Sequence, residues 1–212
     1  MSALRFSSLI ILFPILFAAC GRSELIRIRM LAPVNEDKKD HAIFTDTTSS
    51  SSFTPTITNK NVGGSLYFLF KSIGLGYTTI TTKMEKVDEK LTEKTTLVTN
   101  FADVAFGIGE NYTFMWGAGV LTGGKWETSL EYDSKTFNPK HNYLGGHSLF
   151  FVLGHHGFGF ETLLGYRTNS IKAEFEEINS SDIGKTSEDF TYESNIISLK
   201  TSQVQLGIGF TF

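Results

Sequence analysis

The amino-acid sequence predicts an all-β protein, an antiparallel up-and-down barrel of about eight strands, and three observations lead to that fold class. The first is the closing segment 203–212, in which apolar side chains alternate with polar or small ones at every position. The second is composition, because 20 glycines and 19 phenylalanines stand beside only 4 prolines in 212 residues, which suits strands and turns. The third is that short and long polar connectors alternate along the chain, as they do in transmembrane barrels.

The closing segment predicts a strand with two different faces. Its even-numbered residues are all apolar, namely Val204, Leu206, Ile208, Phe210 and Phe212, whereas the odd-numbered ones are polar or small. In a soluble sandwich the apolar face would point into a core. In a transmembrane barrel it points at lipid, and the polar face lines the interior. Alternation by itself does not separate these two arrangements.

Similar alternation predicts the remaining strands. The eight predicted ranges are 24–33, 42–58, 64–83, 94–109, 111–121, 142–154, 157–175 and 190–212. The range 42–58 contains a serine run and Pro55, which suits a loop equally well, and 124–133 could form a strand of its own. The predicted short connectors are 59–64, 109–111 and 154–157, and the predicted long ones are 35–40, 84–94, 121–141 and 176–189.

The N-terminus has the three parts of a secretory signal: a basic start, the apolar run Leu9–Phe17 and the small residues Ala18-Ala19 before Cys20. The run is too short to span a bilayer as a helix. Residues 1–19 are therefore predicted to be a signal peptide and residues 20–212 a single barrel domain. The ending resembles a lipoprotein signal, in which Cys20 is lipidated, although Phe17 stands where leucine is most common. Ordinary cleavage near Gly21 is the alternative.

Charge and hydropathy exclude several classes of protein. A formal net charge of −3 with no basic stripe does not suit nucleic-acid binding. A single cysteine excludes an internal disulfide. No later segment has the ~18 consecutive apolar residues of a membrane helix, so a mature chain that spans a membrane would have to be a closed barrel.

Five charged residues fall on the inward face of the predicted strands: Arg27, Arg29, Asp103, Glu161 and Arg167. They could form a selectivity ring or a catalytic cluster. An eight-stranded barrel, however, has an interior just wide enough for side chains to fill it. We therefore expect these charges to pair with one another and close the lumen, without a large pore.

Histidines and serines offer little chemistry. His155 and His156 lie in a Gly-His-His-Gly turn, and adjacent residues in an extended turn point in different directions, unlike a metal-binding pair on a helix. The only adjacent His–Ser pair is His147-Ser148, and neighbours in a strand face opposite sides. We expect no catalysis, no cofactor and no metal. The segment 84–94, rich in acids and lysines, is expected to be a solvated loop or a contact for a host protein or polysaccharide.

Aromatic residues near strand ends or on the outer face are expected to form the girdles that membrane barrels place at the bilayer interfaces; they are Tyr67, Phe70, Tyr77, Tyr112, Trp116, Tyr166, Phe210 and Phe212. A lipid-anchored soluble barrel that holds a hydrophobic ligand would instead bury them. The orientation of Phe114, Trp116, Leu206 and Ile208 separates the two.

Terminal Phe212, with Phe210 two residues earlier, resembles the C-terminal assembly signal of bacterial outer-membrane barrels. With the export signal and the closing Gln-Leu-Gly-Ile-Gly-Phe-Thr-Phe, the chain resembles small barrels of the OmpA/OmpX type. Asn61-Val-Gly-Gly-Ser and Lys71-Ser-Ile-Gly-Leu-Gly-Tyr-Thr also look like segments of spirochaete outer-membrane proteins.

The resemblance implies an outer-membrane location, with lipid and the barrel assembly machinery as partners. It implies a structural or adhesin-like role, with host or surface ligands reached through external loops. An outer-membrane lipid hydrolase is the enzyme alternative.

Overall fold

The computed structural model describes residues 26–34, 45–46, 56–87, 91–132, 135–138, 140–157, 159–175, 190–191 and 196–212. The regular structure of these residues consists of strands, and none of it is a helix long and apolar enough to cross a bilayer. The predicted signal peptide (1–19) and Cys20 lie outside the described residues.

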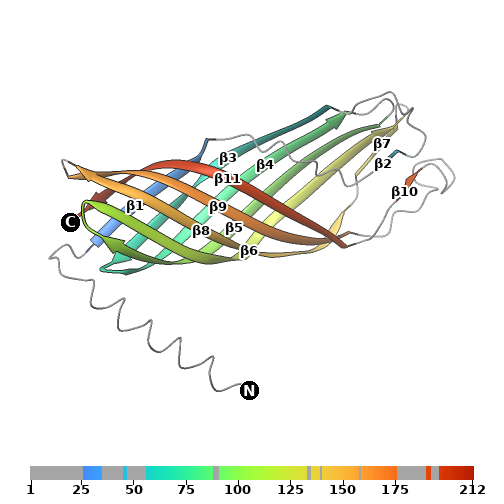
Figure 1. The fold of residues 1–212 in the computed structure, drawn as a ribbon. Helices are drawn as coiled ribbons and strands as arrows, with labels where there is room; N and C mark the ends of the chain where they lie inside the picture. The colour runs from blue at the N-terminus through green and yellow to red at the C-terminus, as the bar shows by residue number, and fades with distance from the viewer. Residues whose placement is uncertain are drawn as a thin grey trace, which may run out of the picture.

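Eight long strands close into a barrel: β1 (Ile26–Pro33), β3 (Thr56–Phe70), β4 (Ile73–Val87), β5 (Leu91–Gly109), β6 (Tyr112–Tyr132), β8 (His141–Gly157), β9 (Phe160–Phe175) and β11 (Ile196–Thr211). Each strand is antiparallel to its neighbours. The ring closes because β5 pairs with β6, and β1 pairs with both β3 and β11. Figure 1 shows the strands crossing the wall obliquely, as closure of a sheet requires. The predicted all-β antiparallel barrel of about eight strands is confirmed.

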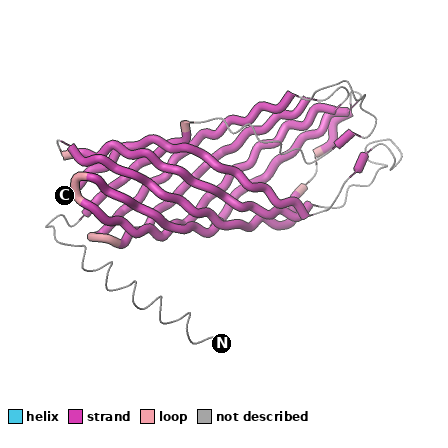
Figure 2. The backbone as a smooth tube through the Cα atoms, viewed as in Figure 1, coloured by secondary structure: helices cyan, strands magenta, loops and turns pink. Residues whose placement is uncertain are grey.

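The two ends of the barrel differ. Short turns at Lys71–Ser72, Glu110–Asn111 and Gly159 lie at one end, the turn end, together with the C-terminus (Figure 2). There the amide of Phe212 donates to the carbonyl of Ile26 at 2.9 Å, which joins the last residue to the start of β1. The other end, the loop end, carries the connections β1–β3, β4–β5, β6–β8 and β9–β11, with the short strands β2 (Thr45–Asp46), β7 (Lys135–Phe137) and β10 (Phe190–Thr191).

Alternation along each strand decides which side chains face inward. In β9, buried and exposed residues alternate almost without interruption from Phe160 to Phe175. The same alternation runs through the turn-end half of β11, where Leu206 and Ile208 are exposed and Gln205 and Gly209 are buried. Because successive side chains of a strand point to opposite faces, the polar and small face of these strands lines the barrel interior.

One predicted strand, 64–83, is wrong: it is two strands. β3 ends at Phe70, the turn Lys71–Ser72 follows, and β4 begins at Ile73. The only residue in this turn of a type common in turns is Ser72, and the turn contains no glycine or proline. Instead Lys71 itself adopts a φ of 56°, which is uncommon for a residue with a Cβ atom.

Two predictions for the chain before this turn also need correction. The predicted strand 42–58 is not one barrel strand, because Thr45–Asp46 (β2) pairs with β10 in a separate sheet whereas 56–58 belong to β3. The other residues of this range lie outside the described residues. The predicted connector 59–64 lies inside β3, paired with β4. Its Asn-Val-Gly-Gly sequence resembles a turn, but Gly63, with a φ of 144°, lets the strand approach the carbonyl of Thr79 more closely than a side chain would permit.

Two predicted long loops are largely strand. Met84–Val87 and Leu91–Lys94 extend β4 and β5 as paired residues, so the connection between the strands is only 88–90. The predicted loop 121–141 contains the second half of β6, which runs unbroken to Tyr132 past an irregularity in the β5–β6 register at Asn100/Phe101. These segments resemble loops in the sequence because charged residues alternate with their few apolar ones, although Met84 and Trp126 are buried in the lumen.

Candidate functional site

The barrel interior contains two buried ion pairs formed by four of the five predicted inward charges. Arg167 pairs with Asp103 and Arg29 pairs with Glu161, and all four side chains are almost completely buried. The fifth, Arg27, is also buried, and its Nη2 donates to the carbonyl of Gly109 at 3.0 Å near the turn end. The structure thus joins four of the five inward charges into two separate pairs.

The Arg167–Asp103 pair is bidentate. Arg167 Nη1 lies 2.9 Å from Asp103 Oδ2, and Nη2 lies 2.8 Å from Asp103 Oδ1. This geometry satisfies both carboxylate oxygens with parallel charge-assisted hydrogen bonds. The guanidinium also stacks between two rings, with its Cζ 4.8 Å from the centroid of Phe101 and 5.3 Å from that of Phe150.

Polar side chains from β9 itself and from four other strands, β3, β4, β8 and β11, complete this layer. Arg167 also donates to the oxygens of Tyr67, Thr78, Ser148 and Asn169. The hydroxyl of Thr78 in turn donates to Asp103 Oδ2 at 2.6 Å. Gln205 of β11 reaches the layer through the hydroxyl of Ser65, 3.5 Å away. Buried charges need such partners to offset their lost hydration, and the layer forms a hydrogen-bonded polar network across the lumen.

The Arg29–Glu161 pair forms a second polar layer nearer the turn end. Arg29 Nε and Nη2 lie 2.7 and 2.9 Å from the two carboxylate oxygens of Glu161. Nη2 also donates to Thr113 Oγ1 at 2.8 Å. The two partners come from β1 and β9, which are not neighbours, since β11 lies between them. The pair therefore crosses part of the lumen.

Two apolar clusters fill the space around these layers. One, toward the turn end, consists of Leu31, Tyr67, Leu69, Ala105, Met115, Phe150, Val152 and Leu163. The other, toward the loop end, consists of Met84, Leu97, Phe101, Trp126, Ile171, Ala173, Phe175 and Leu199. Polar and apolar layers therefore succeed one another along the barrel, as expected for an interior that side chains can fill.

The outer wall carries the opposite pattern, a continuous apolar surface. Of the residues that distinguish a membrane barrel from a soluble one, Leu206 is 51% exposed, Ile208 45% and Phe114 36%, and Trp116 is partly exposed. Exposed apolar side chains occur on all eight barrel strands, among them Met30, Phe68, Leu75, Val104, Val120, Leu149, Leu164 and Leu206. A patch of this extent is rare on a soluble monomer.

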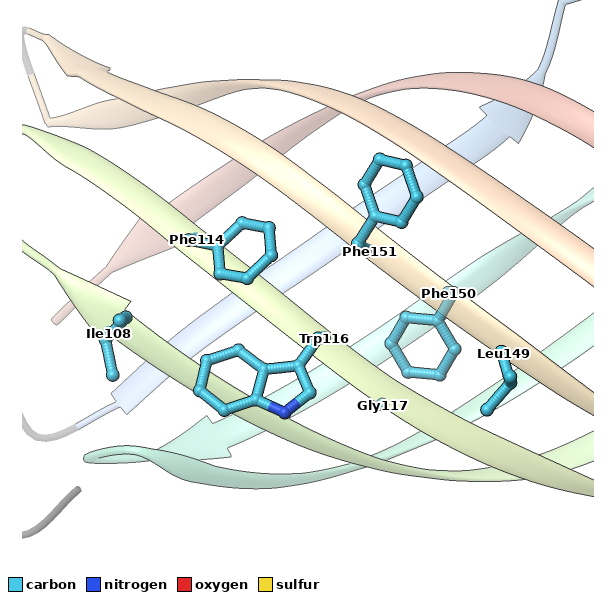
Figure 3. Close-up of a pocket in the computed structure, with 7 residues that line it drawn as sticks. All are labelled: Ile108, Phe114, Trp116, Gly117, Leu149, Phe150 and Phe151. Carbon is cyan, nitrogen blue, oxygen red and sulfur yellow. The ribbon is translucent and has the colours of Figure 1, made fainter. Parts of the chain in front are cut away.

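A hollow interrupts this surface between β5, β6 and β8. It has a volume of about 520 Å³ and is lined by Ile108, Phe114, Trp116, Gly117, Leu149, Phe150 and Phe151 (Figure 3). The rings of Phe114 and Trp116 stack with centroids 5.5 Å apart. Nothing polar converges on the hollow, so its lining suits hydrocarbon and not a polar ligand.

The predicted outer aromatic residues need one correction. Tyr67 is fully buried and faces the lumen, where its hydroxyl contacts Arg167. Tyr67 has the inward parity of Ser65 and Leu69 on β3, whereas Tyr77, on the other side of the turn at Lys71–Ser72, faces outward from β4. The remaining seven lie on the outer side or at the turn end: Phe70, Tyr77, Tyr112, Trp116, Tyr166, Phe210 and Phe212.

The histidines and Ser148 do not converge. Ser148 is buried and accepts a hydrogen bond from Arg167, whereas His147 is exposed on the other face of β8. The Gly-His-His-Gly segment is the end of β8 rather than a turn, and the ring of His155 lies 5.0 Å from that of Tyr112, tilted by 49°. In the described part of the chain, no three histidine, cysteine or acidic side chains are grouped so that they could hold a metal ion.

The sequence did not identify the neutral members of the Arg167 network. Tyr67, Thr78, Ser148 and Asn169 look like ordinary strand residues in the sequence. The inward orientation of two of them could have been predicted, because Ser148 has the parity of Phe150 on β8 and Asn169 has the parity of Arg167 on β9. Their convergence on one guanidinium depends on the register between strands, which the sequence does not reveal.

Comparisons with known proteins complete this description. No protein-family model and no curated protein matches the sequence. Among solved structures, the barrel is similar to that of the outer membrane protein OprG from Pseudomonas aeruginosa. The TM-score is 0.40 and the sequence identity 11%, over 92% of this chain and 98% of that chain. A likeness of this degree carries no argument about what the chain does.

Proposed function

We propose that the chain is a transmembrane barrel of a bacterial outer membrane with a filled lumen, and that it has a structural or adhesin-like role at the cell surface. The observation that carries this proposal is that the distribution of side chains is the reverse of that in a soluble protein. Apolar side chains cover the outer wall of the barrel, and the ion pairs lie in its interior. In an aqueous setting that distribution would expose a large apolar area.

The height of the apolar wall suits a bilayer. On β4 the outward residues run from Ile73 through Leu75 and Tyr77 to threonines, and the first outward charge is Lys83. Ten residue steps at about 3.3 Å each, tilted by about 40°, span roughly 25 Å along the barrel axis. Membrane barrels carry an outward apolar band of about this height.

The orientation of the wall favours the membrane over the soluble-barrel alternative. A lipid-anchored soluble barrel would direct Phe114, Leu206 and Ile208 inward around a hydrophobic ligand, whereas all three point outward. The lipid-hydrolase alternative depended on Ser148 and His147, which lie on opposite faces of β8. The filled lumen also supports a role without a large pore, because the polar network and the two apolar clusters occupy the interior.

Assembly and anchoring are part of the same proposal. Phe210 and Phe212 lie exposed on the closing strand at the turn end, accessible to the barrel assembly machinery. Cys20 precedes β1 by six residues, so a lipid on it would anchor the chain in the leaflet at the turn end. Labelling with a radioactive fatty acid tests this, with incorporation into the wild type and none into Cys20→Ala.

A charge placed on the outer wall tests the membrane location. Leu206→Arg puts a guanidinium near the middle of the apolar band, and Ser198→Arg puts the same group on the same face of β11 beyond it. In lipid vesicles we expect Leu206→Arg to lower the free energy of unfolding by about 2–4 kcal/mol and Ser198→Arg by less than about 1 kcal/mol.

Denaturant titration of the vesicle-inserted barrel, followed by heat-modifiable gel migration, measures both values. In a soluble barrel both positions would be ordinary surface sites with changes within about 0.5 kcal/mol. Equal stability of the two variants, or extraction of the unlipidated chain into aqueous buffer, would contradict the proposal.

Protease treatment of intact cells tests the surface role. Cleavage at the loop end, with the turn end protected, supports that role; the reverse pattern would rule it out.

A further inference from the structure

Two lysines stand directly opposite each other on the outer wall just beyond the apolar band. Lys60 of β3 and Lys83 of β4 are register partners, and both are exposed. Each has the outward parity of its strand, because Lys60 shares it with Val62 and Phe68 of β3, and Lys83 shares it with Leu75 and Tyr77 of β4. Directly opposed side chains have Cβ atoms about 5 Å apart, and like charges so placed are destabilising.

The charged residues that the structure describes around this pair do not neutralise it. Among the described residues neither lysine forms an ion pair, and the nearest acid on β4, Glu85, is 3.5 Å from the ammonium group of Lys94. Other lysines at the same height of the wall are placed differently: Lys125 pairs with Glu127, and Lys172 and Lys200 each face a serine on the next strand. The pair is therefore a local concentration of positive charge.

The position of the lysine pair along the barrel axis indicates which anion it would bind. Lys83 is the first charge at the loop-end edge of the band, where acyl chains give way to headgroups. Long lysine side chains at such a boundary place their stems along apolar surface and their ammonium groups in the polar layer. Anionic lipids supply a fixed negative charge in that layer, and each nearby lysine is worth about a fivefold factor in binding.

We propose that Lys60 and Lys83 together bind the phosphate of an anionic lipid headgroup in the leaflet at the loop end. Two ammonium groups on adjacent strands can contact one phosphate from both sides, and the phosphate relieves their mutual repulsion. The site rests on the proposed membrane location, because only a bilayer around the band brings headgroups to this height.

Native mass spectrometry of the full chain in non-ionic detergent tests the site, with phosphatidylglycerol and phosphatidylcholine as competing probes. The wild type should retain phosphatidylglycerol in preference to phosphatidylcholine. In Lys60→Gln/Lys83→Gln, affinity for phosphatidylglycerol should fall by about 30-fold, since two lysines are lost. The control Lys125→Gln/Lys140→Gln removes the same charge from an ion-paired lysine and a lysine next to β8, and should keep the preference.

Retention of the preference in Lys60→Gln/Lys83→Gln, or its loss in the control, would overturn the inference. Displacement of phosphatidylglycerol by millimolar inorganic phosphate would also do so, because the ligand would then be the free anion and not a lipid. Insertion into phosphatidylcholine vesicles separates the two proposals. If the chain inserts but shows no preference for phosphatidylglycerol, only the lipid site is contradicted. If the chain does not insert, the proposed membrane location is contradicted as well.

Discussion

Removing one partner of the Arg167–Asp103 pair is the perturbation whose result the structure specifies most closely. Asp103→Ala leaves a fully buried guanidinium between two aromatic rings with only neutral oxygens as acceptors. Arg167→Met leaves a buried carboxylate whose remaining donors are the hydroxyls of Thr78 and Tyr67. Breaking a buried pair from one side costs about 3–5 kcal/mol, so each single variant should lose that much free energy of unfolding.

The double variant should not lose the sum. With both charges gone, no uncompensated charge stays in the lumen, and methionine can fill much of the volume of the arginine. We expect Arg167→Met/Asp103→Ala to lose about 3–5 kcal/mol in total instead of the additive 6–10 kcal/mol or so. The coupling free energy between the two positions should therefore be at least about 3 kcal/mol.

Denaturant unfolding in lipid vesicles measures all four corners of this cycle, with tryptophan fluorescence and heat-modifiable migration as independent signals. A matched cycle on Lys94 and Glu85, an exposed pair 3.5 Å apart, should give a coupling below about 1 kcal/mol. Additivity at Arg167 and Asp103 within about 0.5 kcal/mol would refute the reasoning, because the ion pair would then not be what holds the polar layer together.

Three further expectations concern the wall, the lumen and assembly. Brominated acyl chains should quench Trp116 in a Trp126→Phe variant and leave Trp126 nearly unquenched in a Trp116→Phe variant, because Trp126 is buried in the lumen; equal quenching would contradict the orientation of β6. Gly119→Ala should lose about 1–3 kcal/mol of unfolding free energy, because its Cβ would clash with the Asp103 carboxylate and the Ser148 hydroxyl, whereas Ala118→Val on the outer face should be nearly neutral in the same titration. Phe212→Ala should lower the amount of folded barrel in cell membranes without changing refolding in vitro, since Phe212 is 70% exposed; an unchanged amount in cells would argue against an assembly signal.

Several features of the fold could be predicted because they depend on local alternation. The closing strand shows this best: its even-numbered residues Leu206, Ile208 and Phe210 point outward, as their spacing indicates. The inward placement of Arg29, Asp103, Glu161 and Arg167 follows from the same period of two. Because alternation is a property of consecutive residues, the face on which a residue lies can be predicted even when the predicted strand ends are wrong by several residues.

Strand boundaries and Tyr67 show where local alternation is insufficient. The turn at Lys71–Ser72 uses a lysine with a positive φ, so residues 64–83 look continuous, and the outward parity changes unnoticed from even in β3 to odd in β4. The extension Met84–Val87 looks like a loop because Glu85 and Lys86 are charged, yet it pairs with β5 and its Met84 is buried in the lumen.

The sequence by itself determined the barrel class, the side of the wall on which most residues lie, and the presence of charges in the lumen. Only the tertiary structure decided which charges meet: Arg29 with Glu161 across 132 positions, and Arg167 with Asp103 across 64. It alone placed Lys60 opposite Lys83. The physical reason is that these contacts depend on the register between strands, which closure of the whole ring sets and which no single segment encodes.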